Sequence, residues 1–280
     1  MYKFPIGVML DSFRLDTVEA IKKAAELGAH GLQMYATSGE FAPENMSAQK
    51  RRELLDIVKS HGLVFSALCG DLGQGFGNAE KNPHLIEKSK RIMNLAKDLE
   101  TDIVTTHIGV VPRHKNHPRY KILQEACGEL CEYADSLNAH FAIETGPESS
   151  LVLKEFLDSL HSRGVAVNLD PANLVMVTGD DPVGAVYNLK DYIVHTHAKD
   201  GIKLMDSDPE VFYRVIEDVI QEGEAFREMP LGEGNVPFQK YLEALEDIGY
   251  KGFLTIEREV GANPAADIAK AIEFLNKQIG

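Results

Sequence analysis

Two histidines and a lysine alternate along one strand-like stretch of the chain, Ile193–Gly201, which reads IVHTHAKDG. Successive side chains of a strand point to opposite faces, so His195, His197 and Lys199 share one face. Imidazole groups bind metal ions and move protons near neutral pH. Such groups on one face of an otherwise apolar strand indicate a functional site at the carboxyl end of that strand.

Three further strand-like stretches end in a carboxylate. Glu144 closes FAIE, Asp170 closes VAVNLD and Glu257 closes FLTIE. Taken singly, each is equally well a solvated loop acid or a turn residue, and His197 a core histidine. Together, three carboxylates and an imidazole form an oxygen-rich ligand set that suits Mn²⁺, Mg²⁺ or Co²⁺, with Zn²⁺ also compatible. Because three negative groups repel one another without a cation, we expect these four residues to hold one divalent metal ion.

The overall composition limits the classes of function. With 280 residues, of which 44% are apolar, the chain can bury a substantial core in one or two domains. Its net charge of −14 argues against a nucleic-acid partner, because phosphates repel such a surface. Three cysteines are too few for a disulfide framework, which predicts a cytoplasmic location. No apolar run approaches the roughly 18 residues of a membrane span, so no membrane partner is expected.

Short apolar strands alternate with amphipathic helices from one end of the chain to the other. Strands are predicted at 6–10, 31–36, 64–69, 102–107, 141–144, 165–170, from 193 onward and at 253–257. Helices are predicted at 16–27, 47–61, 83–99, 120–138, 151–163, 182–189, 237–248 and 264–277, with Asp16 or Thr17 as the N-cap of the first and Ser47 as that of the second. A long excursion, 202–229, follows the seventh strand and contains an amphipathic piece at 209–222.

This alternation predicts an α/β protein with a single domain over residues 1–280. Eight strand–helix units without a linker or a break in composition specify a closed (β/α)₈ TIM barrel more simply than two open sheets. All strands of such a barrel are parallel, so their carboxyl ends open at one rim. In this geometry, four residues that are distant in the sequence become one site.

Several motifs carry a resemblance to a known family. They are ETG at 144–146, NLDPAN at 168–173, HTHAKD at 195–200, PLGEGNV at 230–236 and TIERE at 255–259. Over nearly its whole length the chain resembles the xylose isomerase-like TIM-barrel superfamily, specifically its sugar phosphate isomerase/epimerase branch. In that family a Glu, an Asp, a His and a Glu from the last four strands hold the metal, which corresponds to Glu144, Asp170, His197 and Glu257. The family ligand heads the sequence His-x-Lys-Asp, so His195 is a supporting residue.

The resemblance implies a divalent-metal-dependent isomerase or epimerase that acts on a small sugar, a sugar phosphate or a polyol ketone. The ketose 3-epimerases of the superfamily use the first and last metal-bound glutamates as acid and base on opposite faces of the substrate, which carries over to Glu144 and Glu257. A metal ion polarises the carbonyl and stabilises the enediolate, while one carboxylate removes the proton and the other returns it. A homo-oligomer is also compatible, because dimers and tetramers are frequent in this superfamily.

The chain departs from those epimerases at two positions. Asn173 stands where they have a His three residues after the metal-binding Asp, and it does not titrate near neutral pH. Ser150 stands where they commonly carry a second Glu, and Glu148 is the nearest acid. We therefore expect Asn173 and Glu148 to contact the substrate, with its polarisation arranged differently from that in the epimerases.

Three more side chains are candidates for substrate contacts. His107 ends the fourth strand and points at the same rim, and Lys199 is placed to neutralise enediolate charge. Arg113 lies in the only dense basic run, 112–119, and arginine offers a bidentate fork to phosphate oxygens. The alternatives are a structural role for His107, a salt bridge from Lys199 to Asp200 or another acid of the rim, and a solvated loop around Arg113.

Three other functions fit the same pattern of residues. A lyase that dehydrates inososes or dehydroshikimate would use the same metal site but expel water. A repair endonuclease of the same fold would need three zinc ions with additional histidines, and both Asn173 and the acidic surface argue against it. A barrel that only binds or senses a sugar would retain its ligand without exchanging the α-proton in D₂O.

Overall fold

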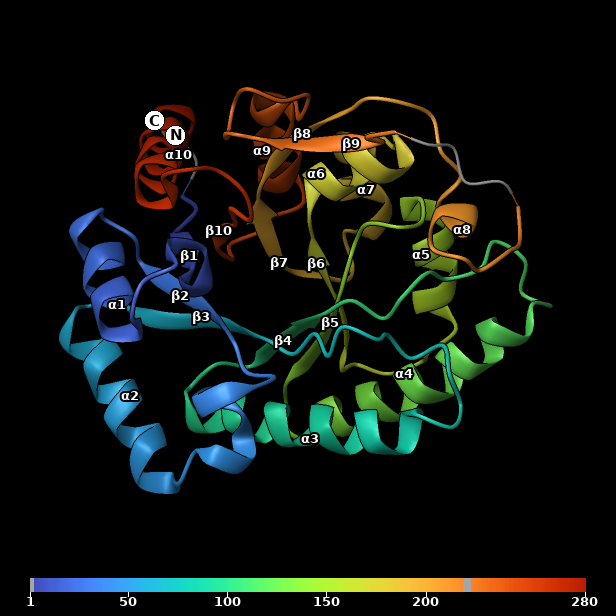
Figure 1. Cartoon of the computed structure of the whole chain (residues 1–280), viewed down its shortest axis with the longest axis horizontal. Helices are drawn as coiled ribbons and strands as arrows, with labels where there is room; N and C mark the ends of the chain where they lie inside the picture. Colours follow the sequence, from blue (N-terminus) through green and yellow to red (C-terminus); the bar gives the residue numbers. More distant parts are fainter. Residues whose placement is uncertain (1–2, 219–222) are drawn as a thin grey trace.

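The structure of the protein is a computed structural model, which describes residues 3–218 and 223–280. In these residues, eight parallel strands close into a barrel in the spatial order β1-β10-β7-β6-β5-β4-β3-β2 (Figure 1). The barrel strands are β1 Ile6–Met9, β2 Gly31–Tyr35, β3 Val64–Cys69, β4 Ile103–Thr106, β5 His140–Glu144, β6 Val165–Leu169, β7 Ile193–Ala198 and β10 Leu254–Ile256. The predicted TIM barrel is therefore confirmed.

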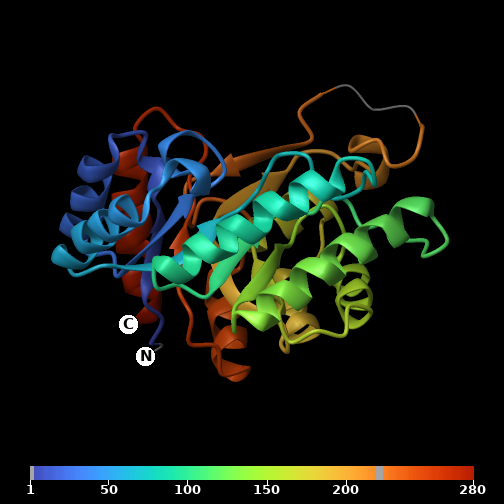
Figure 2. The ribbon, with the colours of Figure 1, turned by 90° about the horizontal axis from the view of Figure 1, so that it is seen from below.

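Helices surround the barrel and bury their apolar faces against it (Figure 1). The longer ones are α1 Thr17–Glu26, α2 Ala48–Ser60, α3 Asn82–Asp98, α4 Pro118–Ser136, α5 Ser150–Asp158, α7 Pro182–Leu189, α9 Phe238–Asp247 and α10 Pro264–Ile279. Short helical turns are η1 Leu10–Phe13, η2 Gly39–Phe41, η3 Pro43–Asn45, α6 Pro171–Asn173, η4 Leu174–Thr178 and α8 Pro209–Phe212. Figure 2 shows α3 and α4 side by side. It also shows the two termini close together, which is consistent with the pairing of the first barrel strand, β1, with the last, β10.

Local capping explains where several helices begin. The side chain of Asp16 accepts a hydrogen bond from the N–H of Val18, so Asp16 and not Thr17 is the N-cap of α1, and Ser47, which accepts one from Lys50, is confirmed as the N-cap of α2. Helix α5 ends at Asp158, five residues before its predicted end. It ends early because the chain turns there, with His161 in the left-handed region at a φ of 49°.

The excursion after β7 forms a hairpin instead of a long helix. Strand β8 (Asp200–Lys203) pairs antiparallel with β9 (Phe226–Met229), and α8 covers only four residues. Of the predicted amphipathic piece 209–222, residues 209–212 are helical and residues 213–218 are not, and residues 219–222 lie outside the described residues. Arg214, with a φ of 56°, breaks the helical repeat soon after α8.

The PLGEGNV segment folds around a single carboxylate. Asp200 accepts hydrogen bonds of 2.8 to 3.0 Å from the backbone N–H groups of Gly201, Gly232, Gly234 and Val236. A Cβ atom at Gly234 would collide with Asp200, so glycine is required there. Asp200 thereby fixes the loop that follows the hairpin. Within the described part of the chain, no helix combines the length and apolar character that a bilayer crossing needs.

Candidate metal centre

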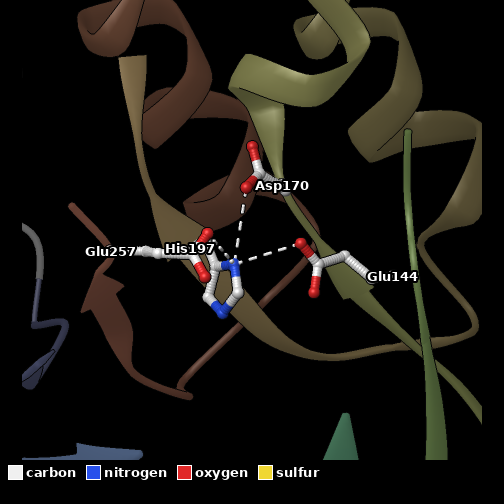
Figure 3. Close-up of side chains that lie close together, drawn as sticks. All are labelled: Glu144, Asp170, His197 and Glu257. Carbon is white, nitrogen blue, oxygen red and sulfur yellow. Dashed lines mark hydrogen bonds and ion pairs between the residues drawn. The ribbon is translucent and has the colours of Figure 1, made fainter. Parts of the chain in front are cut away.

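Four side chains from the carboxyl ends of adjacent strands meet inside the mouth of the barrel (Figure 3). Glu144 ends β5, Asp170 follows β6, His197 lies in β7 and Glu257 follows β10. These strands are consecutive around the barrel, so parallel pairing brings their ends side by side. One ligand atom from each residue lies within 4.8 Å of the others. The structure thus brings together all four residues that were predicted to share an ion.

The distances around His197 suit a metal ion. Its Nδ1 atom lies 3.4 Å from Glu144 Oε1, 3.4 Å from Asp170 Oδ2 and 3.3 Å from Glu257 Oε2. Two atoms that each lie roughly 2.1 Å from one ion are about 3.0–3.4 Å apart at octahedral or tetrahedral angles. Each of the four side chains is at most 8% exposed, so solvent does little to screen the repulsion between the three carboxylates. The donor set therefore fits a divalent cation.

Hydrogen bonds from neighbouring asparagines orient two of the carboxylates. Asp170 Oδ1 accepts a 2.9 Å hydrogen bond from the N–H of Asn173 as the N-cap of α6, which leaves Oδ2 to face His197. Glu144 Oε2 accepts a 3.1 Å hydrogen bond from Asn168, which directs Oε1 into the site. Partners of this kind fix the orientation of metal ligands and raise metal affinity.

Lys199 pairs with two glutamates of the rim. Its Nζ atom lies 2.9 Å from Glu257 Oε2 and 2.6 Å from Glu259 Oε2, whereas Asp200 is engaged by backbone N–H groups. Burial by itself raises the pKa of Glu257, but Lys199 and His197 together hold this pKa well below its usual range. Glu257 is therefore ionised at neutral pH, as a metal ligand must be.

A buried glutamine sets the orientation of His197. His197 Nε2 lies 2.9 Å from Gln33 Oε1, and the amide nitrogen of Gln33 donates to Thr105 Oγ1 at 2.8 Å. With Nε2 as the donor to Gln33, Nδ1 keeps its lone pair for a metal ion. Gln33 was not predicted. Its signal in the sequence is a lone amide inside the apolar stretch 31–36.

His195 lies outside the ligand set. Its Nδ1 atom is 2.8 Å from Asn168 Oδ1, and its Nε2 atom is 2.9 Å from Thr255 Oγ1. Burial lowers the pKa of His195 well below its usual range, and the neighbouring His197 lowers it further. His195 is therefore neutral and fully hydrogen-bonded, which agrees with the supporting role expected for it.

A cavity of about 680 Å³ opens onto the site, with His107, Asn173 and Lys199 in its wall. Burial lowers the pKa of His107, but Glu144, 3.5 Å away, together with Asp71 and Glu257, outweighs this effect and the pKa is raised overall. Asn173 Nδ2 donates to Glu144 Oε1 at 3.2 Å. Three of the predicted substrate contacts thus line the cavity, and their contact with a substrate stays a prediction.

The other two predicted contacts lie outside the described lining of the cavity. Glu148 is buried, and its Oε2 atom accepts a 3.1 Å hydrogen bond from the N–H of Val111. Burial raises the pKa of Glu148 to about 8. Arg113 Nε donates to Glu210 Oε2 at 2.8 Å, and its Nη2 lies 2.5 Å from Asp208 Oδ2. The arginine proposed for a phosphate is therefore already paired with two carboxylates.

Comparison with known proteins identifies the family. Residues 21–278 match the family described as xylose isomerase-like TIM barrel. The chain belongs to the xylose isomerase-like TIM barrel family. Fructoselysine 3-epimerase of Escherichia coli O157:H7 is 23% identical over 257 residues, which cover 87% of this chain and 86% of that protein.

Two solved structures share the barrel fold. The xylose isomerase domain protein from Planctomyces limnophilus has a TM-score of 0.80 and 23% identity, covering 99% of this chain and 96% of that one. The probable 3-DHS dehydratase from Bacillus anthracis has a TM-score of 0.75 and 20% identity, covering 97% of this chain and 98% of that one. Similarity at this level shows the fold, and the reaction must be argued from the site.

Proposed function

We propose that the protein is a divalent-metal-dependent isomerase or epimerase of a small sugar. The observation that supports this is the convergence of Glu144, Asp170, His197 and Glu257 in the barrel mouth. Strands β5 and β10 flank β6 and β7, so the two glutamates approach the site from opposite sides (Figure 3). Carboxylates on opposite sides of a substrate suit proton removal from one face and proton return on the other.

The reaction is proton transfer at the carbon next to a carbonyl. A divalent ion held by the four side chains supplies Lewis-acid polarisation of that carbonyl. One carboxylate, Glu144 or Glu257, takes the proton from the carbon and leaves an enediolate. The other carboxylate takes a proton from solvent and delivers it to the opposite face, which gives an epimer, and the first carboxylate then releases its proton to solvent. Return along the same face to the neighbouring carbon would give the aldose–ketose isomer.

The residues around the two glutamates support these roles. Burial disfavours the charged form of Glu144, but His107 and His197 lower its pKa overall, so the carboxylate is ionised and able to accept a proton. Lys199 does the same for Glu257. The side chains of His107 and Asn173 offer hydrogen bonds to sugar hydroxyl groups from the cavity wall. A sugar, a sugar phosphate or a polyol ketone is a substrate of suitable size and chemistry for this cavity.

Metal analysis followed by isotope exchange tests the proposal. We expect one divalent ion per chain and incorporation of solvent deuterium into a ketose, a ketose phosphate or an inosose in D₂O. The product should keep the mass of the substrate apart from the deuterium. A product lighter by one water would instead identify a lyase, and retention of a sugar without exchange would identify a binding protein.

Glu144→Gln and Glu257→Gln test the acid and base directly. Each amide keeps the shape of the side chain but cannot take the proton, so we expect deuterium exchange to fall by roughly 10²–10⁴-fold. The metal content of each variant separates loss of the base from loss of the ion. Glu125→Gln, a matched change at an exposed position on α4, serves as the control. Exchange at the wild-type rate in a metal-loaded variant would rule out the assigned role.

A further inference from the structure

One arginine in the cavity wall has no acidic partner among the described residues. Arg119, the second residue of α4, lines the same cavity as the candidate metal centre. The other lysine and arginine side chains of the described lining, Lys199 and Arg227, are ion-paired with glutamates. Only burial acts on the pKa of Arg119, and it lowers that pKa. An unpaired guanidinium is unexpected in a chain with 43 acidic and 29 basic residues.

Two glycines make room for this guanidinium. Gly77 follows β3 and Gly109 follows β4, and both flank the Arg119 side chain. A Cβ atom on Gly77 would collide with Nε, and one on Gly109 would lie 3.1 Å from Nη2. Nε is buried without a hydrogen-bond partner, whereas the Nη atoms do not share that complete burial. The side chain thus passes between two loops and keeps its terminal nitrogens free to bind a ligand.

The two arginines of the basic run 112–119 have different surroundings. Arg113 is held by Asp208 and Glu210 and does not belong to the described cavity lining. Arg119 lines the cavity and has no carboxylate within ion-pair distance in the described residues. Binding of an anion within the cavity therefore favours Arg119, because the charge of Arg113 is already neutralised.

We propose that the substrate of the metal centre carries an anionic group, a phosphate or a carboxylate, and that Arg119 binds this group. The proposal rests on the proposed function, since it names the substrate class of the same cavity. A guanidinium presents two parallel N–H groups that match the oxygens of either anion. A neutral sugar offers only hydroxyl groups, whose hydrogen bonds to a guanidinium are weaker than those of an anion, so Arg119 favours an anionic ligand. Arg119 is thus a specificity-determining residue for a sugar phosphate or a sugar acid.

Direct binding measurements test this proposal without turnover. The metal-loaded protein is titrated with orthophosphate, fructose, fructose 6-phosphate and fructuronate. Arg119→Gln should weaken binding of the anions that the wild type binds by about 100-fold and leave the affinity for fructose unchanged. Arg119→Lys keeps the charge but loses the fork, so it should fall between these values. Loss confined to the phosphates identifies a phosphate site, and loss confined to fructuronate identifies a carboxylate site.

Two further arginine variants make the result decisive. Arg163→Gln removes an exposed charge that pairs with Asp135 and controls for the change in net charge. Arg113→Gln tests the other arginine of the basic run. The proposal is overturned if Arg113→Gln abolishes anion binding while Arg119→Gln does not. It is also overturned if no anion binds in a way that depends on Arg119.

Isotope exchange separates this proposal from the proposed function. Equal deuterium exchange into fructose and into both anionic sugars, unaffected by Arg119→Gln, would refute the anion site and leave the isomerase intact. Anion binding that depends on Arg119, with no exchange into any sugar tested, would leave the anion site intact and count against the isomerase. Thermal unfolding of each variant shows that it is folded before these comparisons are made.

Discussion

Two layers of polar side chains fill the carboxyl half of the barrel, and they differ in charge. The charged layer consists of Glu144, Asp170, His197, Lys199 and Glu257, and the neutral layer of Gln33, Thr105, Asn168, His195 and Thr255. Three members of the charged layer follow a member of the neutral layer by two residues on the same strand, so each pair shares one face. Along these strands, the side chains that face the barrel interior thus change from neutral to charged within two residues.

The two histidines of β7 show what separates the layers. Both are buried, and burial alone lowers the pKa of either. Glu257, Glu144 and Asp170 together outweigh burial at His197 and raise its pKa well above the usual range, whereas His195 remains neutral. The acids around His197 favour a positive charge at its Nδ1 atom, which a metal ion supplies when it displaces the proton, whereas His195 is a neutral hydrogen-bonding group.

Asn168 joins the layers. Its amide nitrogen lies 3.1 Å from Glu144 Oε2 and 3.2 Å from His197 Nε2, and its oxygen lies 2.8 Å from His195 Nδ1. The neutral layer thus contacts two members of the charged layer through one side chain. We infer that the neutral layer positions the ligands and that the charged layer binds the ion, and changes in each layer test this division.

The largest effect is expected from a change in the charged layer, Asp170→Asn. Asparagine can still cap α6 through its side-chain oxygen, so the fold should be retained, but a negative ligand is lost. Metal affinity should fall by more than the roughly 10–100-fold that is usual when a residue hydrogen-bonded to a metal ligand is replaced. Titration with Mn²⁺ measures this change, with exposed Asp98→Asn as the control. Unchanged affinity would exclude Asp170 from the ligand set.

A change in the neutral layer, Gln33→Leu, should have a smaller effect. It removes the partner of His197 Nε2 and leaves all four ligands in place, so metal affinity should fall by roughly 10–100-fold. Gln49→Leu is the matched control, because it makes the same change at an exposed position of α2 where the amide hydrogen-bonds only to Glu53 among the described residues. If Gln33→Leu binds Mn²⁺ as tightly as the wild type, the neutral layer does not position His197.

Glu148 is buried outside both layers, and its replacement should leave metal affinity unaltered. Its pKa of about 8 lies above the usual 4.5, so between these pH values the folded state holds a proton that the unfolded state releases. Stability should therefore fall as the pH rises through this window. Glu148→Gln removes this titration and leaves in place His107 and Tyr213, the titratable groups that interact electrostatically with Glu148.

Chemical denaturation at pH 5 and pH 8 measures the effect. The free energy of unfolding of the wild type should fall by roughly 1–3 kcal/mol more than that of Glu148→Gln between these pH values. Parallel pH profiles for the two proteins would show that Glu148 is ionised in its pocket. The contrast with Glu257 would then be lost, because that carboxylate is kept charged by Lys199 whereas no lysine or arginine side chain is among the groups that influence Glu148.

Much of this architecture was predictable because its signals are local. Strand and helix periodicities, together with N-caps such as Asp16 and Ser47, specify the alternation that closes the barrel. Polar residues that end apolar strands marked Glu144, Asp170 and Glu257, and parallel closure placed those ends at one rim. The β8–β9 hairpin was missed because its pairing joins segments more than twenty residues apart and depends on no local turn signal.

By itself the sequence determined the barrel, the strand ends that carry the candidate ligands, and which histidine of β7 heads His-x-Lys-Asp. Only the tertiary structure decided which groups those residues meet. It paired Arg113 with acids from α8 and its N-cap, left Arg119 unpaired beside two glycines, and placed Gln33 of β2 against His197 of β7. The physical reason is that periodicity depends on near neighbours in the chain, whereas the charge and hydrogen bonding of a buried group depend on residues that only folding brings into contact.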